Sequence, residues 1–315
     1  MRERRETMSN VKSLHHAHPD ENIRSSQKAG TYTDVQRLLI YLGLTFVTTF
    51  LWYFIANPDR STWEDMGQMR QSFIALGMVF PVICHVLTRV ITKEGFNFSG
   101  DDNSYFGIVF KDGKWKYFLL AFLLPWFYSE AGNLIELALD PVRYDPEYYI
   151  SLGIEKRLLF ILPAAAIVTG IVGSFAAFGE EGGWRGYMMP KLIKIMGRGR
   201  ALIVGGIIWG LWHAPLTCIG HNFGTDYPGF PYLGILCMCL MCILLGILLT
   251  FITEKSGSVW PAAIMHAVNN AGPSILQGYV NPEKSDASFS IGMISLLISV
   301  AIVVIPVMVI WYNKK

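Results

Sequence analysis

The sequence contains little charge for its length. Only 16% of its 315 residues are Asp, Glu, Lys or Arg, and 52% are hydrophobic, whereas a soluble domain carries about 25% charged residues. The formal net charge of +2 gives no electrostatic basis for binding nucleic acid. Cysteine is also scarce, and the five cysteines all lie within apolar stretches, so no disulfide framework is expected. These shortages argue against a soluble protein and against a secreted disulfide-rich one.

Long apolar runs take the place of the missing charge. A helix needs about 20 mostly apolar residues to cross a bilayer, and the backbone groups of such a segment must pair internally, which favours helices. The sequence therefore predicts an all-α, polytopic membrane bundle of about eight transmembrane helices. The predicted spans are Leu38–Ile55, Ser72–Ile91, Tyr117–Leu139, Leu158–Phe178, Ala201–Ile219, Leu233–Ile252, Ser258–Ile275 and Ser290–Tyr312.

The first part of the chain is polar and precedes the first apolar run. We expect residues 1–36 to form a disordered cytoplasmic tail and residues 37–315 to form the integral membrane domain. With the tail in the cytoplasm, 20 of the 26 Lys and Arg residues fall on the cytoplasmic side and six on the other. Because positive charge accumulates in cytoplasmic loops, both termini are predicted to be cytoplasmic. The expected location is a cell membrane, with a bacterial plasma membrane as the favoured case.

Acidic residues stand out at the inner end of the fourth span. Ionisable groups at bilayer depth cost about 2.5–3.5 kcal/mol on insertion scales, and they therefore often mark function. Glu180 and Glu181 are adjacent, so on a helix they point about 100° apart and meet different surroundings. Arg185 follows Glu181 by four residues, the spacing of a helical ion pair. We predict that Glu181 pairs with Arg185 and that Glu180 is free for chemistry, although an ordinary charged helix end would fit this segment alone.

Two further predicted spans carry isolated polar residues. His213 lies within the fifth span, next to Trp209 and Trp212, whose rings would form the wall of a dry pocket. In the seventh span His266 and Asn270 are four residues apart, so they share one helix face. A lone histidine in a membrane bundle is commonly a structural hydrogen-bonding group. Three such sites in one chain favour function over that reading.

Together these sites supply a carboxylate, two imidazoles and an amide. That combination suits attack of water on a peptide bond, which needs a base to activate water and donors to hold the oxyanion. We expect Glu180, His213, His266 and Asn270 to meet in one water-filled cavity that opens to the cytoplasm.

The three motifs resemble those of the CPBP intramembrane proteases, a family that includes the type II CAAX prenyl endopeptidases and abortive-infection-like bacterial proteins. The family pattern is E-E-x-x-x-R, then F-x-x-x-H, then H-x-x-x-N/D, and it recurs in this order over about residues 158–275, with Trp209 in place of Phe. The resemblance implies that Glu180 activates the attacking water with help from His213. It further implies that His266 and Asn270 stabilise the oxyanion.

The same resemblance implies that Glu181 and Arg185 brace the site. It leaves open a zinc-dependent mechanism in which Glu180, His213 and His266 are metal ligands. Two histidines and a carboxylate can bind zinc and leave one position open for water. The metal-free glutamate mechanism, which is the one we favour, needs no cofactor.

Two other classes of function remain as alternatives. A catalytically silent member acting as a scaffold or in immunity would keep the fold while losing motif residues, and none is missing. A proton-coupled transporter would use the buried acid and histidines as proton carriers, but the internal repeats common in transporters are not seen for these motifs. The expected partners are the lipid bilayer and a peptide or lipidated-protein substrate.

Several other polar or small residues within the spans are predicted to be structural. Glu130 is expected to be a hydrogen-bonded structural acid in preference to a cavity residue, and His85 is likewise expected to be structural. Gly206 and Gly210 have the small-xxx-small spacing of close helix packing.

Overall fold

The computed structural model describes residues 32–96, 105–151, 153, 155, 161–285 and 288–313. Within these residues the chain is helical, with no strand beyond one isolated antiparallel bridge between Tyr144 and Val280. The predicted all-α class is confirmed. Residues 1–31 of the predicted tail lie outside the described residues.

The helices are joined by short connections and single helical turns. The α-helices are α2 (Asp34–Ala56), α3 (Gln68–Ala75), α4 (Phe80–Ile91), α5 (Trp115–Leu139), α6 (Tyr148–Ser151), α8 (Leu162–Gly183), α9 (Met189–Met196), α10 (Arg198–Trp212), α11 (Ala214–Thr217), α12 (Tyr232–Ser256), α13 (Trp260–Ala271) and α14 (Ser288–Asn313). Single turns of 3₁₀ helix are η1 (Leu76–Val79), η2 (Pro141–Arg143), η4 (Leu276–Tyr279) and η5 (Pro282–Lys284), and η3 (Trp184–Met188) is a π-helix.

Each of the eight predicted spans contains a helix, but their lengths differ. Among the described residues, six helical segments are long and apolar enough to cross a membrane, which supports a multi-pass membrane protein. α10 and α13 have only 15 and 12 residues. At 1.5 Å per residue they are about 22 Å and 18 Å long, shorter than the roughly 30 Å hydrocarbon core. These two short helices carry the motif histidines, so the site lies where helices end inside the bundle.

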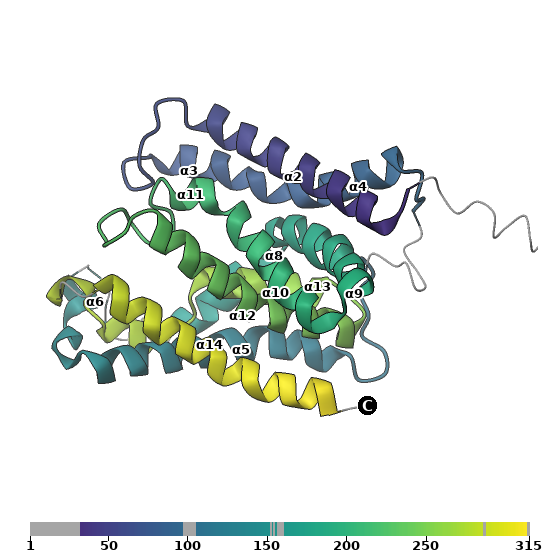
Figure 1. The fold of residues 1–315 in the computed structure, drawn as a ribbon. Coiled ribbons are helices and arrows are strands. Elements are labelled where there is room, and N and C mark those ends of the chain that lie inside the picture. The colour runs from purple at the N-terminus through teal and green to yellow at the C-terminus, as the bar shows by residue number, and fades with distance from the viewer. Residues whose placement is uncertain are drawn as a thin grey trace, which may run out of the picture.

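α13 lies at the centre of the bundle. It packs against α8, α5 and α12, while α10 packs along α12. In Figure 1, α2, α3 and α4 form an upper layer, α5 and α14 form a lower one, and the motif helices lie between them. α4 contacts α8 and α14 contacts α5 and α12, so the short helices are surrounded by the longer ones.

Glycines next to the glutamate pair allow α4 to approach α8 closely. A Cβ at Gly179 would lie 2.6 Å from the carbonyl oxygen of Met78, and one at Gly183 would lie 2.5 Å from the carbonyl carbon of Pro81. Both distances are too short for a side chain. His85 of α4 also contacts the carbonyl oxygen of Gly182 through Nδ1 at 2.9 Å, so its predicted structural role is confirmed.

The small-residue prediction for α10 also holds. A Cβ at Gly206 would lie 2.5 Å from Cα of Ile243, and one at Gly210 would lie 2.5 Å from Cα of Cys239. The backbones of α10 and α12 therefore touch, and this fixes the position of the residues that follow Gly210. The five cysteines are all free.

The bundle has two distinct ends. At the first, which we call the α9 end, the start of α2 and the end of α14 approach α9 and α10: Lys194 lies 2.8 Å from Asp34, and Arg198 stacks over Trp311. At the second, the α11 end, lie the loops 57–67, 140–151, 218–231 and 272–285. There Lys284 lies 2.9 Å from Asp145, and hydrogen bonding from this lysine lowers the pKa of Asp145 to about 2.

Candidate active site

The glutamate pair lies where α8 changes from α- to π-helix. α8 ends at Gly183, and the π-helical turn Trp184–Met188 follows directly. Single π-helical turns within α-helices are frequent at functional sites. Glu180 and Glu181 are 2% and 0% exposed, so each carboxylate depends on protein partners for its stabilisation.

Glu181 contacts two partners from different helical segments. Its Oε1 accepts a hydrogen bond from Nη1 of Arg185 at 3.1 Å and lies 2.8 Å from Nδ1 of His266. The structure therefore forms the predicted Glu181–Arg185 pair and adds a link from α8 to α13. The sequence analysis missed this link because spacing along one helix does not show which helices touch.

Glu180 is held by two tryptophans at one of its two carboxylate oxygens. Its Oε2 accepts hydrogen bonds from Nε1 of Trp209 at 2.8 Å and from Nε1 of Trp184 at 3.3 Å. Trp209 also stacks beneath the Arg185 guanidinium, 4.2 Å from its ring centroid. Trp209 is thus a donor to Glu180 as well as part of the pocket wall. Trp184 was not predicted, although it follows Glu180 by the same four residues that separate Arg185 from Glu181.

His213 stands at the C-terminal cap of α10. Its Nδ1 lies 2.9 Å from the carbonyl oxygen of Trp209, and its ring packs edge-on against Trp212 at a centroid distance of 4.9 Å. A carbonyl oxygen only accepts, so Nδ1 carries the hydrogen and Nε2 of the neutral ring is an acceptor. Trp212, which we expected to line the pocket, instead donates to Thr49 of α2 at 3.1 Å and is fully buried.

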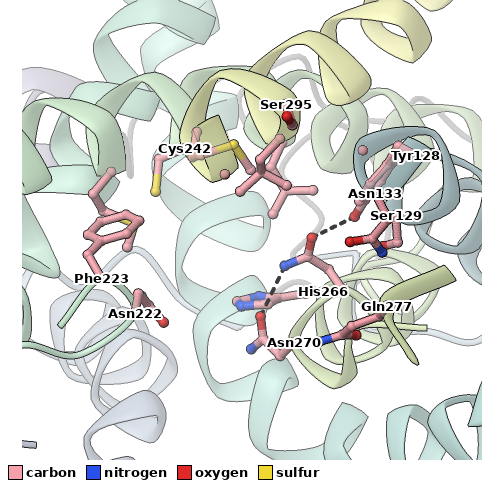
Figure 2. A pocket seen from close by; sticks show the side chains of 18 of the residues that line it. Tyr128, Ser129, Asn133, Asn222, Phe223, Cys242, His266, Asn270, Gln277 and Ser295 are labelled. Atoms are coloured by element: carbon pink, nitrogen blue, oxygen red, sulfur yellow. Dashed lines mark hydrogen bonds between the residues drawn. The ribbon is translucent and has the colours of Figure 1, made fainter. Parts of the chain in front are cut away.

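A cavity of about 570 Å³ lies beside these groups. Of the predicted residues, His213, His266, Asn270 and Trp209 line it, and Figure 2 shows His266 and Asn270 at its surface. Glu180 is not part of the lining but lies directly behind Trp209, to which it is hydrogen-bonded. The structure thus brings the three motifs together, with the carboxylates one layer below the cavity.

Asn270 is oriented by residues that were not among the predicted site residues. Tyr128 of α5 donates to Oδ1 of Asn269 at 2.6 Å, and Nδ2 of Asn269 donates to Oδ1 of Asn270 at 3.2 Å. These bonds connect α5 to the end of α13 (Figure 2). Because its oxygen is occupied, Asn270 has its amide N–H groups available for the cavity that it lines.

Glu130 anchors the segment after α13. Its two oxygens accept hydrogen bonds from the hydroxyl of Ser274 and from the backbone N–H groups of Ile275 and Leu276, at 2.6–3.1 Å. This confirms the prediction that Glu130 is a structural acid. By holding this segment it also fixes one wall of the cavity.

The described residues do not form a metal site. No group of three His, Cys, Asp or Glu side chains among them is arranged to hold a metal ion. Nδ1 of His213 and Nδ1 of His266 face protein oxygens, and Oε2 of Glu180 faces two indole N–H groups. These bonds do not engage Nε2 of either histidine or Oε1 of Glu180, so the zinc alternative stays a prediction.

The cavity opens at the opposite end from the one expected. The exposed residues of its lining are Asn222, Asn270, Gly272 and Gln277, all at the α11 end. Depth along separate spans locates the polar side chains but does not show which loops leave an end of the bundle open. A cytoplasmic opening and cytoplasmic termini, both predicted above, therefore do not hold together for this cavity, and the membrane side that each end faces stays a prediction.

The comparisons with known proteins find a peptidase family over the segment that contains the three motifs. Residues 161–272 match the family model for type II CAAX prenyl endopeptidase Rce1-like proteins. The chain is similar to CAAX prenyl protease 2 of Methanococcus maripaludis (strain DSM 14266), with 31% identity over 102 residues. The match covers 32% of this chain and 38% of that relative, so it spans well under two thirds of the relative's length. The predicted resemblance to a peptidase family is confirmed for this segment, which contains all three motifs.

Proposed function

We propose that the protein is an intramembrane endopeptidase that hydrolyses a peptide bond in the cavity beside His213 and His266. The observation that carries this proposal is the contact between the motifs: Glu181 binds His266, and Glu180 binds Trp209, four residues before His213. Residues from α8, α10 and α13 are thereby held around one space. The match of residues 161–272, the segment that holds these residues, to a peptidase family supports the proposal.

Water activation is assigned to Glu180 and His213. With Nδ1 of His213 bonded to a backbone carbonyl, Nε2 is the acceptor that can orient a water molecule in the cavity. Glu180, which lies one layer below the cavity behind Trp209, takes the proton of this water through one further water as the new oxygen–carbon bond forms. When the tetrahedral intermediate collapses, the C–N bond breaks and the same proton goes to the leaving amine.

Oxyanion stabilisation is assigned to His266 and Asn270. Glu181 occupies Nδ1 of His266, so an imidazolium there presents its Nε2–H to the cavity. Asn270 offers its amide N–H groups, because its oxygen accepts from Asn269. Two such donors, fixed before reaction, stabilise charge that develops only in the transition state. Glu181 and Arg185 act as positioning residues for this arrangement.

The substrate class follows from the location of the cavity. Because the chain is a multi-pass membrane protein, we propose a membrane-anchored peptide or a lipidated protein as the substrate. The name of the matched relative specifies a prenyl substrate for that protein. A prenylated protein is one of the lipidated substrates that this proposal includes.

Glu180→Gln tests the assignment most directly. Gln keeps the shape of the side chain but cannot accept the proton, so cleavage should fall by at least about 100-fold. The measurement is cleavage of a fluorescence-quenched peptide library by purified wild type and variant, with size-exclusion chromatography confirming that both are folded. Glu254→Gln, at an ion pair outside the cavity, is the matched control and should cleave normally.

The same preparation separates the alternatives. Cleavage by Glu180→Gln at the wild-type rate would remove the proposed role of Glu180. Stoichiometric zinc in active protein, with activity lost on chelation and regained on zinc addition, would favour the metal mechanism. Wild-type protein that cleaves no peptide but carries protons across proteoliposomes would favour a transporter, and inactivity in both assays would favour a scaffold.

A further inference from the structure

We infer that the cavity receives its substrate from the α11 end, the side that the charge distribution predicts to be non-cytoplasmic, and that the segment bound there is uncharged. This inference deepens the proposed function and depends on it only in naming the occupant as a substrate. It is carried by the place of the cavity's mouth and by the chemistry of its walls.

The mouth is formed by connections at one end of the bundle. Asn222 and Phe223 come from the loop before α12, and Gly272 and Gln277 follow α13. The remaining members near the mouth are Glu136 in the last turn of α5 and Gly292 in the first turns of α14. All of these positions belong to the α11 end.

The opposite part of the cavity is closed. Its lining residues farthest from the mouth include Trp209, Leu245 and His266, which are only 2%, 5% and 4% exposed. Behind them lie Arg185 and the two buried glutamates, tied together by hydrogen bonds. A substrate approaching from the α9 end would have to displace this network, whereas one approaching from the α11 end meets exposed residues.

The distribution of basic residues relates the mouth to the membrane. Six Lys and Arg residues belong to the α11 side of the predicted topology, compared with 20 on the α9 side. Because positive charge accumulates on the cytoplasmic side, the mouth faces away from the cytoplasm. The cavity therefore suits a peptide segment on the non-cytoplasmic side, including the segment just outside a membrane anchor.

The walls of the cavity differ in chemistry. Apart from His266 at the closed end, whose imidazolium is assigned to the oxyanion, the α5 and α13 side presents uncharged hydrogen-bonding groups, and the α12 and α14 side presents apolar ones. The acid in the lining, Glu136, is paired with Arg143. An extended peptide can pair its backbone with the amides and place apolar side chains on the other wall, while a charged side chain there would lose water without gaining a partner. The polar wall consists of Tyr128, Ser129, Asn133, Asn269, Asn270 and Gln277, and the apolar wall includes Met238, Met241, Leu245 and Leu296.

Cysteine labelling tests the side of entry without requiring activity. The five native cysteines are replaced by alanine, because Cys242 lines the cavity and Cys218 is exposed. Gln277→Cys is then treated with a membrane-impermeant maleimide in intact cells and in inverted vesicles. We expect labelling in intact cells only. Lys194→Cys, exposed at the α9 end, is the matched control and should label in inverted vesicles only.

Labelling of Gln277→Cys in inverted vesicles only, or equally from both sides, would overturn the inferred side of entry. If the cysteine-free chain does not accumulate, a protease site inserted after Asp226, which is exposed in the loop before α12, provides the second test. Cutting by protease added to intact cells supports the inference, and resistance there with cutting in inverted vesicles overturns it.

The uncharged character of the substrate is tested in detergent. A cleaved library peptide is compared with versions carrying Lys or Asp two residues on either side of the cut, and we expect kcat/KM to fall by at least about tenfold. Equal cleavage of charged versions would overturn this part of the inference. Failure of the proposed function appears separately, as Glu180→Gln cleaving like wild type, and leaves the labelling result unchanged.

Discussion

The two halves of the candidate site are built differently. The buried half consists of Glu180, Glu181 and Arg185, which are at most 4% exposed and are bonded across three helices. The open half consists of His213, at the cap of α10, and Asn270, exposed at the end of α13. His266 joins them, since its Nδ1 meets Glu181 and its ring lines the cavity.

The difference in burial between the two halves predicts which residues contribute to stability and which contribute only to catalysis. Groups in the buried half replace their lost hydration with fixed partners, so removing one partner leaves an unsatisfied charge in the protein interior. Groups in the open half face the cavity, so removing one exposes little that was buried. We therefore expect substitutions in the buried half to reduce both stability and turnover, and substitutions in the open half to reduce turnover alone.

Glu181→Gln should have the largest effect on stability. One oxygen of Glu181 serves both Arg185 and His266, and Gln can keep that oxygen while losing the charge that balances the guanidinium. Leaving a buried charge unpaired costs about 3–5 kcal/mol. The measurement is thermal and denaturant unfolding in detergent, together with peptide cleavage, which should be abolished.

Glu254→Gln is the matched control for this variant. It removes the partner of Arg198 at a pair that is 37% and 23% exposed, where an ion pair contributes about 0–1 kcal/mol. If Glu181→Gln were no more destabilising than Glu254→Gln, the buried half would not be an electrostatic unit. Partial recovery of stability in Glu181→Gln with Arg185→Gln would confirm that the lost charge balance is the cause.

Trp209→Phe should have an intermediate effect. Phe keeps a ring beneath Arg185 but removes the N–H that binds Glu180, and a hydrogen bond to a charged group contributes about 1.5–3 kcal/mol. Glu180 retains the bond from Trp184, so the protein should fold. Because the carboxylate is then less well positioned, we expect kcat to fall by about 10- to 100-fold with little change in KM, as measured by steady-state cleavage.

Trp260→Phe makes the same chemical change outside the site. The indole of Trp260 donates to the carbonyl oxygen of Phe106 at 3.0 Å, a neutral bond whose loss costs about 0.5–1.5 kcal/mol. Its turnover should match that of wild type. A parallel loss of kcat in both variants would mean that indole donors support the fold and that Trp209 has no special relation to Glu180.

The sequence was sufficient for those features that depend on local spacing. Glu181 and Arg185 pair because they are four residues apart on one helix, and Gly206 and Gly210 pack because small residues at that spacing form a flat helix face. The Glu181–His266 contact and the Tyr128–Asn269 bond join helices that are distant in the chain. Both contacts depend on how α8, α5 and α13 pack against one another, so the spacing of residues along one helix could not predict them.

Helix length shows the same limit. Composition located the apolar runs around His213 and His266, but it predicted helices long enough to cross the membrane. α10 and α13 are shorter than that length. α10 ends at Trp212, three residues before Pro215, and α13 ends at Ala271, capped by Gly272 with a positive φ. These breaks leave His213 and Asn270 at helix ends beside the cavity, and they were hidden because the residues that follow remain apolar.

Asn270→Ala should have the smallest effect on stability and still reduce turnover. Asn270 is exposed, so the unfolding free energy should change by no more than about 0.5 kcal/mol. Loss of one oxyanion donor lowers kcat by about 10²–10³. Asn281→Ala, in a loop at the same end and outside the cavity lining, should cleave normally. Full activity in Asn270→Ala would remove its amide from the oxyanion site. A stability loss as large as that of Glu181→Gln would show that both halves of the site form one structural unit, because an exposed amide could produce such a loss only by holding α13 in place.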